Sequence, residues 1–233
     1  MLECLIFDMD DTLYDEINYC RSGYRVISHA ISAMLAPGTQ RTVSSAEIFD
    51  FIWNQFQNGD RSRIFNDTLD NFYIPYDSKV ITDLVKIYRD HSPIISLDPA
   101  DADILTQLRG KYKLALLSDG FLPAQQLKAD ALGLDKYFDM ILFTESIRRD
   151  AWKPSPLGYQ KILTDLNITT NCWAYIADNE TKDFIYPNAA GATSIKLNRP
   201  NKVHIKPAPN LQACPQYSID SLAQLPQILS SLT

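Results

Sequence analysis

Short apolar runs alternate with longer amphipathic segments through most of this chain. The runs have the length and the even hydrophobicity of strands buried on both faces of a parallel sheet. They are residues 2–7, 112–117, 140–143, 173–177 and 193–197. Apolar positions at helical spacing lie between them, over 100–109, 123–132, 157–166 and 181–190. Strands that alternate with helices predict a parallel sheet covered by helices on both faces.

Turn and capping residues mark several boundaries in this pattern. Gly133 and Gly191 are expected to stop the helices that precede them. Ser155 is predicted to be the N-cap of the helix over 157–166, with Pro156 at its first position. The last part of the chain is predicted to be a surface connection over 198–217, with four prolines, and a short closing helix over 219–228, which Pro226 weakens.

A long stretch between the first two predicted strands contains only helical patterns. Ile17, Tyr24 and Ile31 recur every seven residues, and Pro37-Gly38 is expected to end this helix. Further helical patterns cover 48–56, 64–73 and 80–88. The predicted fold class is therefore α/β, a three-layer α/β/α Rossmann-like parallel sheet core with an inserted α-helical cap subdomain. The core is assigned to residues 1–14 and 91–233, and the helical cap to 15–90.

Composition places the chain among ordinary globular proteins. It has 233 residues, of which 45% are hydrophobic and 21% are charged, so disorder is not expected. The net charge of -6 argues against binding a nucleic acid polymer, although it does not argue against a small anionic substrate. The four cysteines lack the paired spacing of a metal site and are predicted to be reduced thiols.

No signal peptide or membrane span is indicated by the apolar runs. Glu3 makes the N-terminus acidic, whereas a secretory signal begins with basic residues before a long apolar region. No later run approaches the length that crosses a membrane. We therefore expect a cytoplasmic protein, whose oligomeric state the sequence does not indicate.

Three carboxylates follow the first predicted strand within four positions: Asp8, Asp10 and Asp11. Ligand sites of parallel sheets lie beyond the carboxyl ends of the strands, so these groups are expected where chemistry occurs. Carboxylates this close repel one another unless a cation or a proton relieves the repulsion, and bound Mg²⁺ is the simplest solution. The alternative is an acidic turn that only caps the next segment. A calcium loop is excluded, because Leu13 stands where such a loop needs glycine.

Further polar residues follow later apolar runs in the same manner. Ser118 follows the strand 112–117, Lys153 precedes Pro154, and Asp178 and Asp183 follow the strand 173–177. Together with Asp8-x-Asp10-x-Thr12, these four motifs resemble the haloacid dehalogenase-like hydrolase superfamily, in the order that its members show. The resemblance is clear in the core, is weak in the cap, and is closest to phosphatases with a helical cap. Ala177 departs from the family pattern, which usually has glycine before the motif aspartate.

The resemblance implies a role for each motif residue. Asp8 would be the nucleophile that forms an aspartyl-phosphate, and Asp10 would be the general acid and then the general base. Mg²⁺ would be held by Asp8, the backbone carbonyl of Asp10, and Asp178. The predicted phosphate-binding residues are Ser118, Asp119, Gly120 and Lys153, and the predicted supporting residues are Thr12, Asn179 and Asp183. Asp183 would bind the metal through water or orient Lys153.

The predicted function is a Mg²⁺-dependent phosphatase that hydrolyses a small phosphorylated metabolite, such as a sugar phosphate or a nucleoside monophosphate. The candidate cap contacts to the leaving group are Arg21, Tyr24, Arg61 and Arg63. Alternatives on this fold are a 2-haloacid dehalogenase, a sugar phosphomutase and a catalytically silent binding protein. The resemblance argues against a dehalogenase, because those enzymes need no acid at the position of Asp10. A pure binding protein would not need the full motif set.

Overall fold

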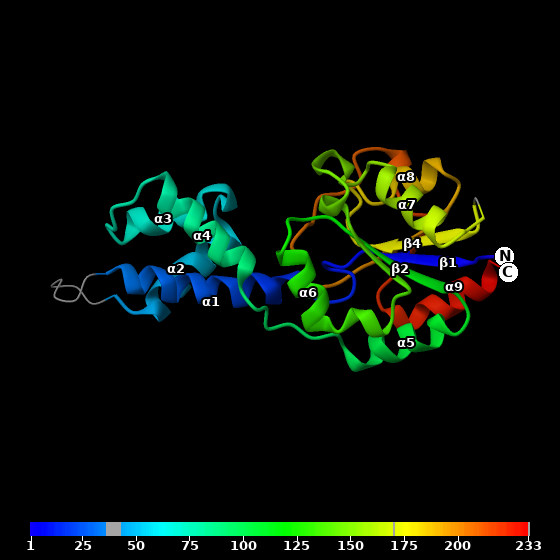
Figure 1. The fold of residues 1–233 in the computed structure, drawn as a ribbon, viewed down its shortest axis with the longest axis horizontal. Helices are drawn as coiled ribbons and strands as arrows, with labels where there is room; N and C mark the ends of the chain where they lie inside the picture. The colour runs from blue at the N-terminus through cyan, green and yellow to red at the C-terminus, as the bar shows by residue number, and fades with distance from the viewer. Residues whose placement is uncertain (36–42, 170, 233) are drawn as a thin grey trace. The chain divides into compact units, whose positions relative to one another are not determined.

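The computed structural model describes residues 1–35, 43–169 and 171–232, and its contacts divide the chain into two compact units (Figure 1). The core unit consists of Met1–Ile17 and Ile95–Thr233, and the helical unit consists of Asn18–Ile94. The sequence predicted that the helical insert would begin after residue 14 and end at residue 90. In the structure, the helical unit begins after residue 17 and ends at residue 94. The insert therefore begins within a helix rather than before it.

The core unit is built on a six-stranded sheet in which every pair of neighbouring strands is parallel, with the order β3-β2-β1-β4-β5-β6. The strands are β1 (Cys4–Phe7), β2 (Lys113–Ser118), β3 (Met140–Phe143), β4 (Trp173–Ala177), β5 (Thr193–Leu197) and β6 (Tyr217–Ile219). Because β1 lies between β2 and β4, the residues that follow these three strands meet at one edge of the sheet. The predicted α/β fold class is confirmed.

Helices cover both faces of this sheet (Figure 1). Helices α7 (Leu157–Asp165) and α8 (Ile185–Ala189) lie on one face, and α5 (Pro99–Arg109) and α9 (Leu225–Ser231) lie on the other. Helix α6 (Ala124–Leu132) follows β2 and ends at Gly133, whose φ of 63° is left-handed and therefore suits glycine. All four residues of β1 are fully buried, as expected of a strand between two helical layers.

Three details of the core unit differ from the sequence-based predictions. The connection 198–217 is mostly exposed, but it ends in β6, a strand too short to leave a periodic pattern. Helix α8 begins at Ile185 rather than near 181, because Asn179 accepts hydrogen bonds from the backbone and hydroxyl of Thr181 and forms a turn there. Ser155 does not cap α7, since Pro156 is the residue before the helix and no side chain caps it.

Proline is well placed in the closing helix. Pro226 lies in the first turn of α9, where its missing N–H would have no partner within the helix.

The core unit also contains short 3₁₀ helices. These are η2 (Leu134–Lys136), η3 (Thr144–Ser146), η4 (Arg149–Ala151), η5 (Leu211–Ala213) and η6 (Leu222–Gln224).

The helical unit carries an aromatic core. Its helices are α1 (Glu16–Met34), which starts in the core unit, α2 (Ser45–Asn58), η1 (Arg61–Arg63), α3 (Ile64–Asn71) and α4 (Ser78–Asp90). Tyr24 of α1 packs against Phe56 and Tyr88, with ring centroids 5.4 and 5.2 Å away. Ser44 begins α2 with a reciprocal capping box to Glu47. The predicted stop at Pro37-Gly38 lies outside the described residues. Among the described helices, none is long and apolar enough to cross a membrane.

Candidate active site

Adjacent strand ends bring two of the motif carboxylates together. The backbone N–H of Asp8 donates to the carbonyl of Ile176 at 2.9 Å, so the pairing of β1 with β4 continues to the first carboxylate. Asp178 follows directly after β4. Ala177, where the family pattern has glycine, pairs with Lys196 in the ladder, so the alanine is compatible with a regular strand end.

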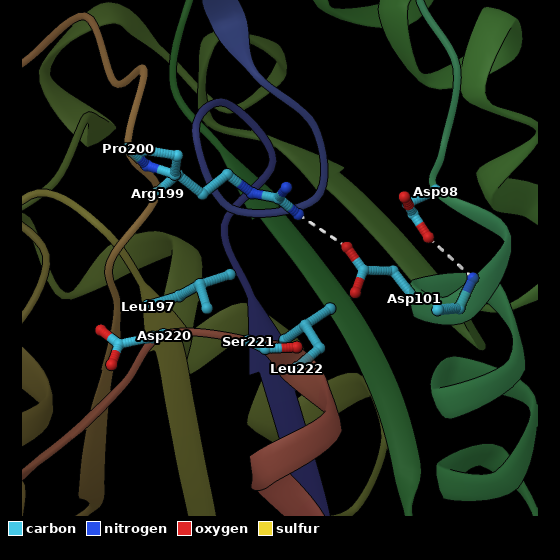
Figure 2. A pocket seen from close by; sticks show the side chains of 9 residues that line it. Asp98, Asp101, Leu197, Arg199, Pro200, Asp220, Ser221 and Leu222 are labelled. Carbon is cyan, nitrogen blue, oxygen red and sulfur yellow. Dashed lines mark hydrogen bonds and ion pairs between the residues drawn. The ribbon is translucent and has the colours of Figure 1, made fainter.

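The connection after β5 holds the turn that carries Asp10. The guanidinium of Arg199 donates from Nε and Nη2 to the carbonyl of Thr12, at 3.1 and 2.9 Å. Its Nη2 also lies 2.7 Å from a carboxylate oxygen of Asp101 on α5 (Figure 2). This arginine lines a cavity together with Asp98, Ala100, Asp101, Leu197, Pro200, Asp220, Ser221 and Leu222. The predicted supporting role of Thr12 thus involves its backbone carbonyl in this structure.

Asp11 stabilises the same turn from within. Its φ of 52° lies in the left-handed region, which aspartate tolerates better than most residues. Its carboxylate accepts hydrogen bonds from the backbone N–H groups of Glu16, at 2.8 Å, and Val203, at 2.6 Å. The third carboxylate after β1 is therefore a structural anchor for its neighbours.

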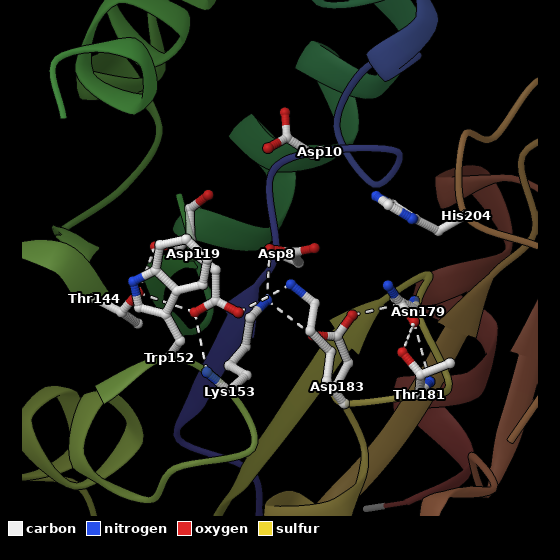
Figure 3. Close-up of polar contacts among 12 residues, drawn as sticks. Asp8, Asp10, Asp119, Thr144, Trp152, Lys153, Asn179, Thr181, Asp183 and His204 are labelled. Atoms are coloured by element: carbon white, nitrogen blue, oxygen red, sulfur yellow. Dashed lines mark hydrogen bonds and ion pairs between the residues drawn. The ribbon is translucent and has the colours of Figure 1, made fainter. Parts of the chain in front are cut away.

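Lys153 lies at the centre of the buried charges (Figure 3). Its ammonium contacts Asp8 at 2.7 Å, Asp183 at 2.8 Å and the Tyr175 hydroxyl at 2.9 Å. The side chain is fully buried, which works to lower its pKa, but Asp183 and Asp8 together hold that pKa well above its ordinary value. The lysine is therefore charged and directed at the proposed nucleophile.

Three buried carboxylates could hold a metal ion. One oxygen from each of Asp8, Asp178 and Asp183 lies within 4.8 Å of the others. Among the described residues, Asp178 Oδ2 is buried and has no hydrogen-bond partner. Burial, followed by the negative charges of Asp183 and Asp8, raises the pKa of Asp178 to about 9. An oxygen-lined cluster of this kind, with an unsatisfied carboxylate atom, fits a hard divalent cation.

Asp10 faces away from this cluster and toward α6. Its carboxylate accepts hydrogen bonds from Lys128 Nζ at 2.8 and 3.0 Å, from Gln125 Nε2 at 3.2 Å, and from the Tyr14 hydroxyl. Burial works to raise the pKa of Asp10, but Lys128, Tyr14 and Gln125 hold it below its ordinary value. In this arrangement Asp10 is a carboxylate and therefore has the form of a general base.

The last residue of β2 and the residues that follow it form the other side of the site. The Ser118 hydroxyl donates to Gln125 Oε1 at 3.3 Å. Asp119 Oδ1 accepts from Thr144 Oγ1 at 2.9 Å and from the backbone N–H of Lys153 at 3.1 Å. Gly120 has a φ of 137°, and a Cβ there would lie 2.1 Å from Gln125 Nε2, so only glycine fits. Gly120 therefore allows Gln125 to approach closely.

A polar cavity of about 240 Å³ opens onto these groups. Its lining residues are Asp8, Asp10, Glu16, Asp119, Gly120, Gln125, Trp152, Asp178, Asn179, Lys182 and His204. Three of the predicted residues do not line this cavity: Lys153, Ser118 and Asp183. Ser118 contacts the lining residue Gln125 through a hydrogen bond, and Asp183 forms an ion pair with Lys153. Figure 3 shows Asp8, Asp119, Lys153 and Asp183 directed toward one another, with His204 on the side of the connection after β5.

The four candidate cap residues have contacts within the helical unit. Tyr24 is buried in its aromatic core. The guanidinium of Arg21 lies 4.9 Å from the Trp53 ring centroid, and that of Arg61 lies 4.2 Å from the Phe56 ring centroid. Arg63 forms an exposed ion pair with Asp67 at 3.6 Å. Each of the four thus also has a packing or charge-pairing role.

Several site residues were not predicted from the sequence. Gln125 and Lys128 lie on the buried side of α6, in a stripe that also contains Ala124, Ala129 and Leu132. Polar residues at the inward positions of an amphipathic helix were the available signal. Lys182 and Arg199 had no such pattern, because they lie in connections.

The fold and the site together define a three-layer α/β protein with a buried centre of carboxylates and lysine at the carboxyl edge of its sheet. A family model described as haloacid dehalogenase-like hydrolase matches residues 2–191, and the chain belongs to that family. The predicted resemblance is therefore confirmed.

Curated and solved relatives agree with this assignment. A glyceraldehyde 3-phosphate phosphatase of Methanopyrus kandleri is 24% identical over 236 residues, covering 100% of this chain and 99% of the relative. The magnesium-bound HAD-hydrolase YfnB of Bacillus subtilis is similar with a TM-score of 0.70, at 19% identity and 98% coverage of both chains. A 2-haloacid dehalogenase of Pseudomonas syringae is similar with a TM-score of 0.65, at 20% identity and 100% coverage of both chains. The solved structures support the fold alone.

Proposed function

We propose that this protein is a Mg²⁺-dependent phosphatase that hydrolyses a small phosphomonoester through an aspartyl-phosphate on Asp8. The observation that carries the proposal is the buried triangle of Asp8, Lys153 and Asp183 beside Asp178, of which Asp8 and Asp178 line the polar cavity. A carboxylate that attacks phosphorus needs a nearby positive charge, since its target is itself negative. The relatives named glyceraldehyde 3-phosphate phosphatase match nearly all of this chain, so that compound is the first substrate to test.

In the first step, a carboxylate oxygen of Asp8 forms a bond to phosphorus while the bond between phosphorus and the leaving oxygen breaks. Asp10 gives its proton to the departing alkoxide. The observed contacts of Asp10 with Lys128 stabilise its ionised form, so substrate binding has to weaken that ion pair before this transfer. The helical unit is proposed to contact the leaving group.

In the second step, water attacks the phosphorus of the aspartyl-phosphate, and the bond to Asp8 breaks. Asp10, now a carboxylate, takes a proton from that water, and orthophosphate leaves. The hydrogen bonds that Asp10 accepts from Lys128, Gln125 and Tyr14 favour this ionised form. The same carboxylate therefore serves both steps, with opposite protonation states.

Mg²⁺ would be held by Asp8, Asp178 and Asp183, whose oxygens are close enough to share one ion. It would supply charge that neutralises the phosphoryl oxygens. This ligand set includes the Asp183 side chain, whereas the sequence-based set had the Asp10 carbonyl. Asp183 would additionally orient Lys153 through their 2.8 Å ion pair.

The proposal is tested by phosphate release from a panel of phosphorylated metabolites, with Mg²⁺ and after exhaustive EDTA treatment. We expect release from at least one small phosphomonoester, loss of release in EDTA, and recovery on adding Mg²⁺. Equal activity in fully chelated protein would argue against the metal. Halide release from a 2-haloacid, with no phosphate release from any compound, would instead identify a dehalogenase.

A further inference from the structure

Lys182 and Asp119 form an ion pair across the mouth of the site. Lys182 Nζ lies 2.9 Å from Asp119 Oδ2. Lys182 comes from the connection after β4, and Asp119 follows β2, while β1 and Asp8 lie between these two strands. Both residues line the same cavity as Asp8. The pair therefore spans the region in which a group bound to the nucleophile must lie.

The two lysines near Asp8 differ in the hydrogen bonds that they can offer. The Lys153 ammonium donates hydrogen bonds to Asp8 and Tyr175 and forms an ion pair with Asp183. A phosphoryl oxygen that approached Lys153 would therefore compete with these three buried partners. The Lys182 ammonium has one hydrogen-bond partner among the described residues, Asp119, and the side chain is 31% exposed. Lys182 can therefore bind an additional anion.

Asp119 is held in place without Lys182. Its Oδ1 accepts from Thr144 Oγ1 and from the backbone N–H of Lys153, whereas Lys182 contacts Oδ2. Because different oxygens are used, Lys182 can turn toward a new partner while the Asp119 carboxylate keeps its orientation. The ion pair is therefore not needed to orient Asp119 after β2.

We infer that Lys182 is a second phosphoryl-binding residue, whose ammonium leaves Asp119 and donates to a nonbridging oxygen of the phosphomonoester held at Asp8. This inference rests on the proposed phosphatase function and assigns a substrate contact in the core unit. The ligand class is a tetrahedral phosphate dianion, because a compact charge is what a single flexible ammonium binds best. Lys153 would keep its contacts with Asp183 and Tyr175 and would neutralise the negative charge of Asp8.

The test is calorimetric titration of orthophosphate into the full chain in saturating Mg²⁺. The variants are Lys182→Met, which removes the charge, and Lys182→Arg, which keeps it. Lys161→Met is the matched control, since Lys161 lies on α7 and forms an exposed ion pair with Asp165 at 2.9 Å. Loss of one charge-assisted hydrogen bond should raise the Kd of Lys182→Met for orthophosphate about tenfold. Lys182→Arg should recover most of this loss, and Lys161→Met should match the wild-type Kd.

The result that overturns the inference is an unchanged Kd in Lys182→Met, or a wild-type protein that does not bind orthophosphate. Circular dichroism checks the fold of each variant. If Lys182→Met does not fold, Lys182→Gln replaces it, because the amide can still donate to Asp119 while it lacks the charge. A wild-type protein that binds orthophosphate but hydrolyses no ester would reject the proposed function separately, because binding does not require turnover.

Discussion

Charged side chains are buried at the carboxyl edge of the sheet in the core unit, whereas in the helical unit they lie at the surface around an aromatic core. Lys153 and Asp183 have fully buried side chains 2.8 Å apart. The ion pair of Lys79 with Asp83 on α4 has side chains 78% and 50% exposed. Burying a charge pair costs several kcal/mol in desolvation, and apolar residues in its place would often be more stable. The proposed function accounts for this difference, because the core unit would retain its buried charges for chemistry, while the helical unit is built mainly for packing.

The strongest test of this contrast is Asp8→Asn. An amide is too poor a nucleophile to attack phosphorus, so phosphate release should fall below detection while the fold is kept. Asp165→Asn, in an exposed pair with Lys161, should keep full activity. Both are measured by phosphate release and circular dichroism, with mass spectrometry to exclude deamidation of the new asparagine. Turnover by intact Asp8→Asn would remove Asp8 from the mechanism.

The second test is Asp10→Asn, which should separate two classes of substrate. Alkyl phosphates need a proton on the leaving oxygen, so their hydrolysis should fall by roughly 10²–10⁴-fold. An activated aryl phosphate needs that proton less, and its burst of aryl alcohol should survive while steady turnover slows for lack of a base. The measurement is rapid-quench kinetics on both substrates. Equal losses in burst and steady state for both would make Asp10 a structural residue.

The third test compares a buried with an exposed lysine in stability. Lys153→Met leaves Asp8 and Asp183 without their cation, so we expect the free energy of unfolding to fall by about 3–5 kcal/mol. Lys161→Met removes one partner of an exposed pair and should change it by less than about 1 kcal/mol. Urea unfolding in EDTA measures both. If both variants lowered the free energy of unfolding by similar small amounts, the buried ion pairs of Lys153 would contribute little to stability.

The sequence predicted the parts of the site that follow from strand ends. Asp8, Ser118 and Asp178 each follow a strand of the apolar pattern, and parallel order brings such residues to one edge. Because strand length and hydrophobicity are local properties, these positions can be read without knowing the tertiary contacts. The fold class was predictable for the same reason.

The parts that the sequence did not predict depend on contacts between distant segments. Arg199 reaches Thr12, which is 187 positions away, and Lys128 reaches Asp10, which is 118 positions away. Neither pairing leaves a local pattern. β6 has three residues, which is too short for a periodic pattern, and its pairing with the edge of β5 defines it as a strand. Pairing with a neighbouring strand, rather than a local sequence pattern, determines where so short a strand forms.

The fourth test uses the pKa of Asp178. Aspartate in an unfolded chain has a pKa of about 3.9, whereas burial raises the pKa of Asp178 to about 9. The folded metal-free protein therefore holds a proton that the unfolded chain has lost, so stability should fall as pH rises between these values. In EDTA, we expect Asp178 alone to lower the free energy of unfolding by up to about 3 kcal/mol between pH 6 and pH 8.5.

Asp178→Asn should remove part of this pH dependence. Another part should remain, because burial also raises the pKa of Glu16 to about 8. Mg²⁺ should flatten the dependence in the wild-type protein and have little effect in the variant, since the variant lacks one of the charged oxygens. Urea unfolding at both pH values, with EDTA or Mg²⁺, provides the comparison. A wild-type stability that rises from pH 6 to pH 8.5 in EDTA would contradict the burial argument.

The smallest expected effect concerns Arg61 in the helical unit. Its guanidinium lies 4.2 Å from the Phe56 ring centroid, and its Nε donates to the Phe56 carbonyl at 2.8 Å. Arg61→Ala should therefore lower the free energy of unfolding by about 0.5–1 kcal/mol, because Arg61 itself is exposed and its contacts with Phe56 are only partly buried. Arg63→Ala, which loses a 3.6 Å surface ion pair, should lower it by less.

Activity separates the roles of these two arginines further. If either one contacts the leaving group, its removal should raise the KM for the metabolite substrate but leave kcat/KM for a small aryl phosphate unchanged, since the aryl compound lacks the group that is recognised. The chemistry of the core unit should be untouched in both variants, because Arg61 contacts Phe56 and Arg63 pairs with Asp67, both of which lie in the helical unit. Equal loss on both substrates would show that the helical unit supports the chemical step itself. The contrast between a packing unit and a chemical unit would then be too simple.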